Sequence, residues 1–255
     1  MTLDILICTI DEGIEKVPEV LMSPRGDVRY VVSMELTTPA DEEERLARVP
    51  KVLREREDVT LTFLEGKGLS RNRNNALSSA TGDVVVMADD DNRYTDELIG
   101  NIFEAYEAHP EADVIHFQAL DLEGKPLHPY PAPYVSSVEM TFRRRVTTRF
   151  DERFGLGSPQ LCAGEEEVWM KDARDAGYRI LYVAKPIVMT PGGTTGTRFA
   201  GNRKLQMSKG ATFKHVYGTP NALWRTLKEA GWWMVHRKEN PFPIVYNMLK
   251  GMIKI

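Results

Sequence analysis

The chain has 255 residues, of which 42% are hydrophobic and 27% are charged, and its formal net charge is −4. This is the composition of an ordinary soluble protein, long enough to bury a substantial core as one large domain or two small ones. Two cysteines exclude a disulfide framework and a zinc-binding pattern, and no segment approaches the roughly 20 apolar residues that span a bilayer.

Charge is distributed unevenly along the chain. Residues 198–255 contain eleven Lys or Arg and two acids, a local balance of +9, so the first 197 residues carry −13. This asymmetry indicates that the C-terminal part meets an anionic partner: a membrane surface, phosphates or nucleic acid. At the other end, Asp4 interrupts a short apolar run that lacks a basic leader. We therefore expect no signal peptide and a cytoplasmic protein.

Predicted strands and helices alternate over residues 1–119. The predicted strands are 3–10, 28–34, 59–63, 84–88 and 113–119, and the predicted helices are 15–22, 42–56, one that begins at Ser70 and one that begins at Thr95. Pro50 is expected to break or kink the second helix, and Ser70 is expected to cap the third. The alternation predicts an α/β fold with a mostly parallel central sheet.

After residue 119 the pattern changes. We expect a hairpin turn at 123–124, an antiparallel strand at 138–146, a glycine-rich loop at 150–157, a helix at 165–176 that stops at Gly177, one or two strands at 178–188 and a loop at 191–196. From about residue 202 the chain is expected to be helical and basic. We therefore divide it into a domain 1–200, with halves 1–119 and 120–200, and a helical C-terminal region 201–255.

Residues 82–92, Gly-Asp-Val-Val-Val-Met-Ala-Asp-Asp-Asp-Asn, are the centre of the functional prediction. A short apolar run is typical of a strand buried on both faces, and it ends abruptly at Asp89, Asp90 and Asp91. In open α/β sheets ligands bind outside the carboxyl ends of the strands. Adjacent acids repel one another unless a cation compensates them, and carboxylates suit Mg²⁺ or Mn²⁺. The alternative is a solvated acidic loop in which Asp91 or Asn92 caps the next helix.

Two further groups of residues are candidates for chemistry. Residues 165–167 are three glutamates at the start of a predicted helix, where a rigid carboxylate can act as a general base. The same position also stabilises acids through the helix dipole, without any catalytic role. Arg71, Asn72, Arg73 and Asn74 open a helix after a glycine-rich loop, and such residues either bind phosphate or lie on an ordinary surface.

Taken together, these motifs resemble the family 2 glycosyltransferases with the GT-A fold. The resemblance covers about residues 3–217. Its motifs are Gly68-x-x-x-x-Arg73-Asn74-x-Ala76, Gly82-Asp83-Val84-Val85-Val86 before the acids at 89–91, Phe150-Asp151-Glu152-x-Phe154-Gly155, and Glu165-Glu166 upstream of Ala176-Gly177-Tyr178-Arg179-Ile180.

The resemblance implies a role for each candidate residue. Residues 1–119 would be the nucleotide-sugar half of a GT-A catalytic domain, and residues 120–200 the acceptor half. Asp89 and Asp91 would bind Mn²⁺ or Mg²⁺ and, with Asp90, the donor diphosphate. Glu166 would be the catalytic base beside Glu165, although Asp is commoner in the family at this position. The remaining donor-binding candidates are Thr9, Asp11, Glu35 and Arg73.

One departure from the family concerns the metal. Many relatives carry a His after the last strand of the sheet that completes metal coordination, but this chain has Met189-Thr190-Pro191 there. It has no His between His128 and His215. Either His215 folds back to the metal, or fewer protein ligands and more water hold the ion, which Mg²⁺ and Mn²⁺ tolerate.

The implied activity is inverting, metal-dependent sugar transfer of the bacterial polysaccharide type. The donor would be a nucleotide-sugar, with a UDP-sugar favoured, and the acceptor a glycan or lipid-linked glycan. Two alternatives stay open. A sugar-phosphate nucleotidyltransferase should have a glycine-rich, Arg-containing loop after the first strand, where this chain has Thr-Ile-Asp-Glu-Gly. A catalytically silent module would bind a glycan or a partner enzyme. No motif resembles a base-reading one, so no nucleic-acid partner is expected.

The last 24 residues combine apolar, aromatic and basic side chains. The apolar residues recur at intervals near four and form one predicted helical stripe, made of Ile244, Val245, Met248, Leu249, Met252 and Ile253. With Trp232, Trp233 and the neighbouring bases, residues 232–255 have the pattern of an interfacial helix on the anionic inner face of the cell membrane. The alternative is that the stripe packs on the catalytic domain or on a second subunit.

Overall fold

The computed structural model describes residues 1–128, 136–191 and 199–255. The chain forms two compact units. We call the first the sheet unit (Met1–Lys67, Arg71–Arg149 and Ala173–Gly192) and the second the helical unit (Gly68–Ser70, Phe150–Asp172 and Gly193–Ile255). The predicted division at residues 119 and 200 is a functional one and stays a prediction.

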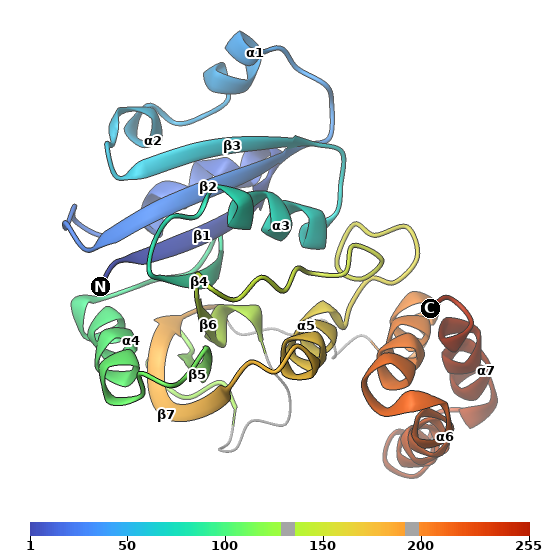
Figure 1. Cartoon of the computed structure of the whole chain (residues 1–255). Coiled ribbons are helices and arrows are strands. Elements are labelled where there is room, and N and C mark those ends of the chain that lie inside the picture. The colour runs from blue at the N-terminus through green and yellow to red at the C-terminus, as the bar shows by residue number, and fades with distance from the viewer. Residues whose placement is uncertain (129–135, 192–198) are drawn as a thin grey trace. The chain divides into compact units, whose positions relative to one another are not determined.

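The sheet unit is built on one seven-stranded sheet with the order β3-β2-β1-β4-β6-β5-β7 (Figure 1). The strands are β1 Leu3–Ile10, β2 Val28–Leu36, β3 Val59–Glu65, β4 Val84–Asp89, β5 Val114–Leu120, β6 Met140–Arg143 and β7 Ile180–Met189. All pairs are parallel except those of β6, which runs antiparallel to both β4 and β5. The α/β fold with a mostly parallel sheet, predicted from the sequence, is confirmed.

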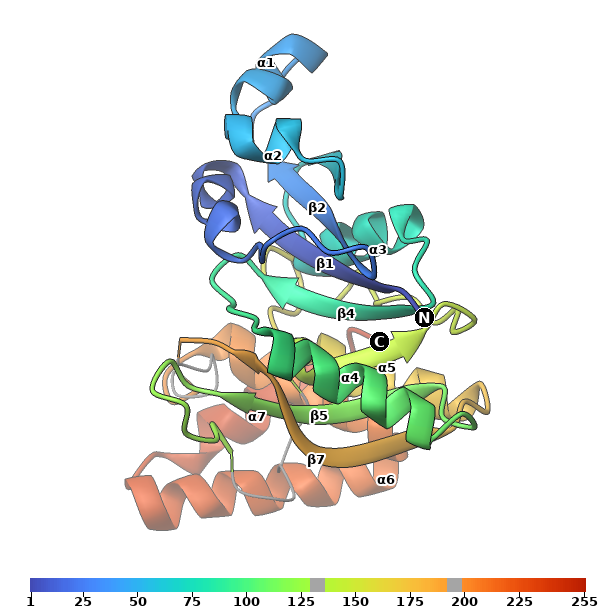
Figure 2. The same ribbon diagram turned by 90° about the vertical axis from the view of Figure 1, so that its left-hand side faces the viewer.

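The central strands are buried because their side chains are apolar on both faces. Leu3, Ile5 and Ile7 of β1 and Val84 and Val86 of β4 are all fully buried. Such continuous apolar runs are what a parallel sheet covered on both faces requires. They form one core cluster with residues of the helix α4, Asp96–Ala108, which contacts β7 (Figure 2).

The first and the third of the helix predictions were wrong in part, and the predicted break in the second is confirmed. The first predicted helix is a 3-10 helix, η1, at Asp11–Glu19 rather than at 15–22. Pro50 does break the second, giving α1 Glu42–Ala47 and α2 Lys51–Glu55. Ser70 does not cap the third, because α3 spans Leu69–Ser79 and the Ser70 hydroxyl donates to the Phe154 carbonyl at 2.7 Å instead. The fourth helix, α4, begins one residue after its predicted start, because Thr95 is its N-cap and accepts from Leu98 N at 3.3 Å.

The segments after residue 120 follow the predictions with shorter bounds. A one-turn 3-10 helix, η2, occupies Ser137–Glu139 and leads into the short antiparallel β6. β7 is one strand, with irregular pairing to β5 near Pro186. Most of the predicted loop 191–196 lies outside the described residues.

The helical unit contains α5 Glu165–Asp175, α6 Arg203–Arg237 and α7 Pro241–Met252, although the last residues of α5 belong to the sheet unit. α6 is kinked at Gly218, whose φ is 73°, two residues before Pro220. α7 packs closely on the first part of α6, where a Cβ on Gly210 would lie 2.0 Å from the Met248 carbonyl oxygen. Among the helices that the structure describes, none is long and apolar enough to cross a membrane.

Candidate functional site

The carboxyl ends of β1, β2 and β4 bring most of the predicted donor-binding residues to one edge of the sheet. Register pairs Cys8 of β1 with Asp89 of β4, and Ile10 of β1 with Glu35 of β2. Glu35 is buried and Asp89 is half-buried. Burial raises the pKa of the Cys8 thiol to about 12, against the lowering effect of the Arg73 charge. The Cys8 side chain is therefore an uncharged thiol at neutral pH, and the acids supply the chemistry at this edge.

Thr9 holds the second acid of the cluster. Its hydroxyl donates to Asp90 Oδ2 at 2.6 Å. Gly13 closes over this pair, because a Cβ at that position would lie 2.5 Å from both Thr9 Oγ1 and Asp90 Oδ2. A larger residue at position 13 would therefore displace the Thr9 hydroxyl and the Asp90 carboxylate from this contact. Two residues that the sequence placed together, Thr9 and Asp90, are in direct contact.

Asp11 uses its carboxylate in hydrogen bonds to Thr37. It has a φ of 43°, and its carboxylate accepts from Thr37 N at 2.9 Å and from Thr37 Oγ1 at 2.7 Å. These bonds tie the end of β1 to the residue that follows β2. Although partial burial alone would raise the pKa of Asp11, the Thr37 bonds and the Lys67 charge lower it. Asp11 thus shapes the rim of the edge as an ionised carboxylate.

The sequence interpretation named Asn72 as a phosphate-binding or surface residue, but it missed that Asn72 joins two strands beneath the site. Asn72, on α3, is buried and donates from Nδ2 to Thr9 O at 3.0 Å and to Ser33 O at 3.1 Å, while its Oδ1 accepts from Ser33 Oγ at 2.5 Å. Asn75, one turn later, donates to the same Ser33 hydroxyl at 2.9 Å and to Thr62 Oγ1 at 3.0 Å. The sequence signal that could have predicted this role is the run of Asn residues at the start of α3, together with the polar Ser33 inside the apolar strand β2.

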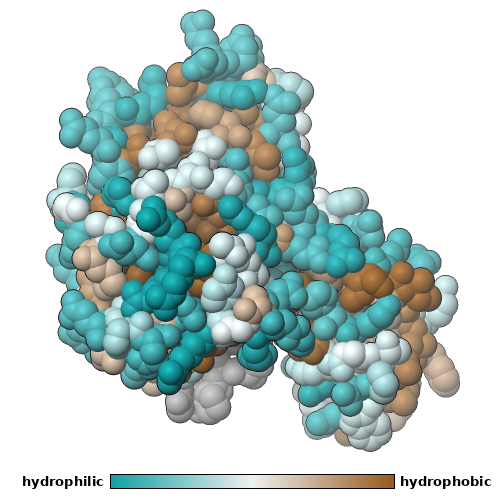
Figure 3. Space-filling view, in the orientation of Figure 1, coloured by the Kyte–Doolittle hydropathy of each residue, from teal (hydrophilic) through white to brown (hydrophobic). Residues whose placement is uncertain are grey.

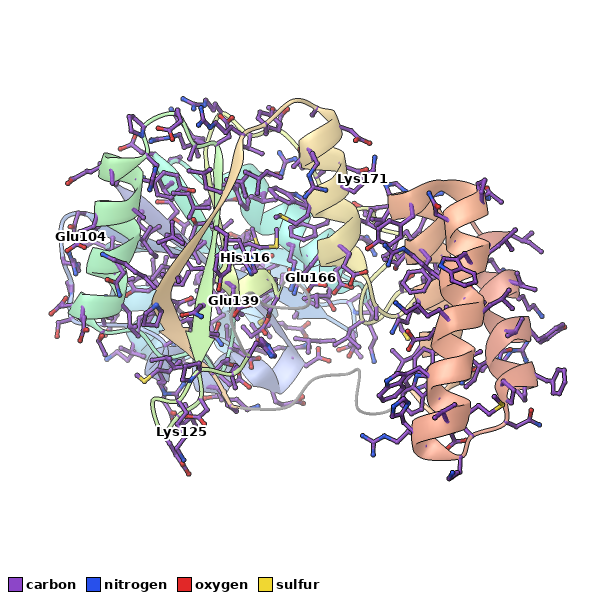
Figure 4. The ribbon with its side chains drawn as sticks, turned by 90° about the horizontal axis from the view of Figure 1, so that it is seen from below. Glu104, His116, Lys125, Glu139, Glu166 and Lys171 are labelled. Carbon is purple, nitrogen blue, oxygen red and sulfur yellow. The ribbon has the colours of Figure 1, made fainter. Side chains whose placement is uncertain are left out.

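Arg73 points into the sheet unit rather than to solvent. It is 3% exposed and donates to Ser137 Oγ at 2.7 Å. Its partner lies in η2, which Glu139 holds by accepting from Ser136 N at 3.3 Å and from Ala119 N at 2.8 Å. The same carboxylate lies 3.4 Å from His116 Nε2, and Figure 4 shows the two side chains together. A chain of buried polar contacts therefore positions the Arg73 guanidinium.

The turn after β4 presents the acids. Asn92 Oδ1 accepts from Asp89 N at 2.9 Å, and Asn92 N donates to Asp89 O at 3.3 Å, so the backbone reverses directly after the strand. Partial burial, and then the charge of Asp90, raise the pKa of Asp91. Burial and the Asp89 charge also raise the pKa of Tyr94, whose buried hydroxyl has no hydrogen-bond partner among the described residues.

These observations fit a hard divalent cation. Three carboxylates stand at the end of one strand, and Thr9 occupies one of them. Burial, and then the charge of Asp90, raise the pKa of Asp91, and a bound cation would offset both effects. Asp89 and Asp91 are the residues that would hold the ion, with water and a phosphate as further ligands. Within residues 1–128, 136–191 and 199–255, no three His, Cys, Asp or Glu side chains form a ready-made metal cage.

The helical unit holds the predicted base. Of the three glutamates that open α5, Glu165 is 4% exposed, Glu166 is half-buried and Glu167 is exposed. Figure 4 shows Glu166 near the start of the helix, with Lys171 further along it. A Cβ on Gly155, whose φ is 102°, would lie 3.4 Å from Glu165 Oε1 and 2.8 Å from Ser70 Oγ. The glycine-rich loop thus packs on Glu165, so Glu166 is the more accessible of the two candidate catalytic residues.

His215, the predicted third metal ligand, has a protein partner in the helical unit. Its Nε2 lies 2.6 Å from Asp172 Oδ1, which joins α6 to α5. Burial alone would raise the pKa of Asp151. The Arg153 hydrogen bonds, and to a smaller extent the His215 charge, lower it below its ordinary value. Because Asp172 engages Nε2, a metal role for His215 would fall to its other ring nitrogen, Nδ1.

Comparison with known proteins identifies the family pattern and the fold. The model of the family "Glycosyl transferase family 2" matches residues 43–155. The match includes Arg73 and the acids at 89–91 but not Thr9, Glu35 or Glu166. No curated protein matches the sequence significantly.

Solved structures share the fold at low sequence identity. The structure of TarS from S. aureus is 15% identical with a TM-score of 0.56, over 93% of this chain and 44% of that one. The TarS 1–349 complex with UDP-GlcNAc is 14% identical with a TM-score of 0.57, over 93% and 74%. The mannosyltransferase PcManGT from Pyrobaculum calidifontis, in complex with GDP-Man and Mn²⁺, is 14% identical with a TM-score of 0.53, over 99% and 74%. The chain therefore spans less than half of the first of these proteins, and the likeness concerns the fold alone.

Proposed function

We propose that this chain, which carries a glycosyl transferase family 2 domain on a GT-A fold, moves a sugar from a nucleotide-sugar donor to a glycan or lipid-linked glycan with inversion at the anomeric carbon. The observation that carries the proposal is the acid cluster directly after β4, held by Thr9 and Asn92 at the carboxyl edge of a parallel sheet. A UDP-sugar is the favoured donor, in keeping with the UDP-GlcNAc complex of a protein of the same fold.

The diphosphate of the donor is negatively charged, and residues at the carboxyl edge of the sheet compensate that charge. Asp89 and Asp91 would hold Mn²⁺ or Mg²⁺, which would supply positive charge for the departing diphosphate. Arg73 adds a positive charge at the same strand ends, since it lowers the pKa of Cys8 beside Asp89, and its contact with Ser137 orients the guanidinium. Thr9, Glu35 and Asp11 border the same edge, where the nucleoside binds. His215 remains paired with Asp172 and is not required as a ligand.

Glu166 supplies the base. Its carboxylate accepts the proton of the acceptor hydroxyl while the hydroxyl oxygen forms a bond to the anomeric carbon, and the bond from that carbon to the diphosphate oxygen breaks. The nucleoside diphosphate leaves with the bonding electrons. Because attack occurs opposite the leaving group, one displacement inverts the configuration. Glu165 is buried against Gly155 and positions the start of α5 rather than meeting the acceptor.

Donor binding is tested by thermal unfolding of the full chain with UDP-, GDP- and TDP-sugars, each with and without Mn²⁺. We expect one donor class to stabilise the protein only when Mn²⁺ is present, by about 2.7 kcal/mol at roughly one hundred times its Kd. If no nucleotide-sugar stabilises the chain under either condition, the proposed activity is wrong.

Turnover then separates an enzyme from a binding module. Glu166→Gln should retain donor binding but release nucleoside diphosphate roughly 10²–10⁴-fold more slowly in the presence of glycan acceptors, the usual value of a general base. Glu167→Gln, one residue away and exposed, is the matched control and should turn over normally. Donor binding without any transfer in the native chain would identify a silent module, and pyrophosphate-dependent exchange would identify a nucleotidyltransferase.

A further inference from the structure

α7 is apolar on two separate faces. Ile244, Met248 and Met252 are buried on the face that packs against α6. On this face a Cβ at Gly251 would lie 1.8 Å from the Met207 carbonyl oxygen, and Lys214 Nζ donates to Met252 O at 2.8 Å. Half of the stripe predicted from the sequence is therefore an internal packing surface, and it is not available to a partner.

A second apolar stripe of α7 is exposed. Phe242 is 80% exposed, Tyr246 62%, Leu249 37% and Ile253 83%. Successive members lie four, three and four residues apart, so they line one helical face. We call these four residues the α7 stripe. In Figure 3, brown surface follows the position that α7 has in Figure 1.

The second half of α6 exposes a similar stripe, which the sequence interpretation did not identify. Its buried face consists of Ala222, Thr226 and Ala230. A neighbouring face carries five large apolar side chains that are between 43% and 67% exposed, namely Leu223, Trp224, Leu227, Met234 and Val235. We call these five residues the α6 stripe. The two stripes lie on consecutive helices that are joined by residues 238–240.

The charge around both stripes has one sign. Residues 203–255 contain ten Lys or Arg and two acids. One acid, Glu229, lies 2.9 Å from Lys209 Nζ and accepts from Trp233 Nε1 at 2.8 Å, so its charge is used locally. Lys228, Arg237, Lys238 and Lys254 are exposed and Lys250 is half-buried. The stripes are therefore surrounded by unbalanced positive charge.

We propose that the α6 and α7 stripes dock this chain on the surface of an anionic lipid bilayer. Exposed Trp, Tyr and Phe beside Lys and Arg are what an interfacial helix needs, because the rings enter the headgroup region while the bases meet lipid phosphates. A second copy of the chain fits less well, because a symmetric contact would bring two positively charged surfaces together, and lysine is depleted in protein interfaces. The proposal is independent of sugar transfer.

The test measures co-sedimentation of the full chain with two kinds of vesicle, pure phosphatidylcholine and phosphatidylcholine mixed with phosphatidylglycerol. We expect binding to the mixed vesicles that falls as salt increases. The variant Phe242→Ser, Tyr246→Ser, Ile253→Ser should lose about tenfold or more in partition, because it removes three large apolar side chains from the α7 stripe. These side chains are exposed, so the variant should keep its fold, which its unfolding midpoint will show.

The control replaces exposed apolar residues of the sheet unit, in Val52→Ser, Leu122→Ser. It should bind the mixed vesicles as the native chain does. The proposal is overturned if the native chain stays in the supernatant with both kinds of vesicle, or if the triple variant binds like the control. Sedimentation velocity completes the test: a native dimer that becomes monomeric in the triple variant, without vesicle binding, assigns the α7 stripe to a second copy instead.

Discussion

At the scale of single residues, the folded chain holds Asp91 in surroundings that disfavour its ionised carboxylate. Its pKa lies above the ordinary value of 3.8 because of burial and then because of Asp90. The unfolded chain restores the ordinary pKa, so between the two values the unfolded state binds fewer protons than the folded state. The free energy of unfolding therefore falls as the pH rises through this window.

The corresponding variant is Asp91→Asn. In metal-free buffer at neutral pH we expect it to unfold with a free energy higher than that of the native chain by about 1 kcal/mol or less. The gain should disappear below the ordinary pKa, where the unfolded carboxyl is also protonated. Urea unfolding over a series of pH values measures it, with the exposed Glu43→Gln as control. A variant that is less stable than the native chain at every pH would contradict the argument. Added Mn²⁺ should stabilise only the native chain.

The positions of the acids could be predicted from the sequence, but the residues that hold the site in place could not. A buried β-branched run that ends in three carboxylates is a local pattern, so Asp89 to Asp91 could be predicted from it. Asn72 and Ser137 could not, because their roles depend on which strand and which 3-10 turn pack beneath α3. The Asp172 contact of His215 likewise joins residues 43 positions apart, and no local signal encodes it.

At the scale of elements, strand predictions held well because buried parallel strands are continuous apolar runs. The helix starts were less predictable. Ser70 has the residue type of a cap but bonds to Phe154, 84 residues away, so a tertiary contact replaces the local one. Similarly, the C-terminal stripe has a helical period that the sequence gives correctly, but periodicity cannot say which of two apolar faces packs on α6 and which stays exposed.

Gly251 illustrates the difference between propensity and packing. Glycine weakens a helix, yet a Cβ here would overlap the backbone of α6 at Met207. We expect Gly251→Ala to lower the free energy of unfolding by about 2–4 kcal/mol, because α7 must move away from α6. Gly231→Ala, in α6 with no atom within 4 Å of the added Cβ, should instead raise it by up to about 1 kcal/mol. Equal effects in the two variants, measured by urea unfolding, would contradict close packing of the helices.

At the scale of the whole molecule, the residues proposed for donor binding and the residue proposed as the base belong to different units. The residues proposed to bind the donor and metal, from Thr9 to Asp91, lie in the sheet unit, and Glu166 lies in the helical unit. The fold class and the family resemblance were predictable from the sequence, and the family match and the shared fold confirm them. The composition of the units was not predictable, because the helical unit takes residues 68–70 from the start of α3 and 150–172 from the middle of the chain.

This division makes truncation informative. A chain that ends at Glu239 lacks α7 and loses the burial of Ile244, Met248 and Met252, each worth about 1.5–3 kcal/mol. We expect calorimetry to show a lower unfolding temperature for the helical unit. Mn²⁺-dependent binding of the nucleotide-sugar should persist, because every residue proposed for it lies in the sheet unit. Transfer should fall sharply, because α6, which contacts α5 through His215 and Asp172, loses its packing on α7. The Phe242→Ser, Tyr246→Ser, Ile253→Ser variant is the control, since it alters only the exposed face and should keep both binding and transfer to a soluble acceptor. Loss of nucleotide binding on truncation, with the sheet unit still folded, would mean that the donor site extends into the helical unit.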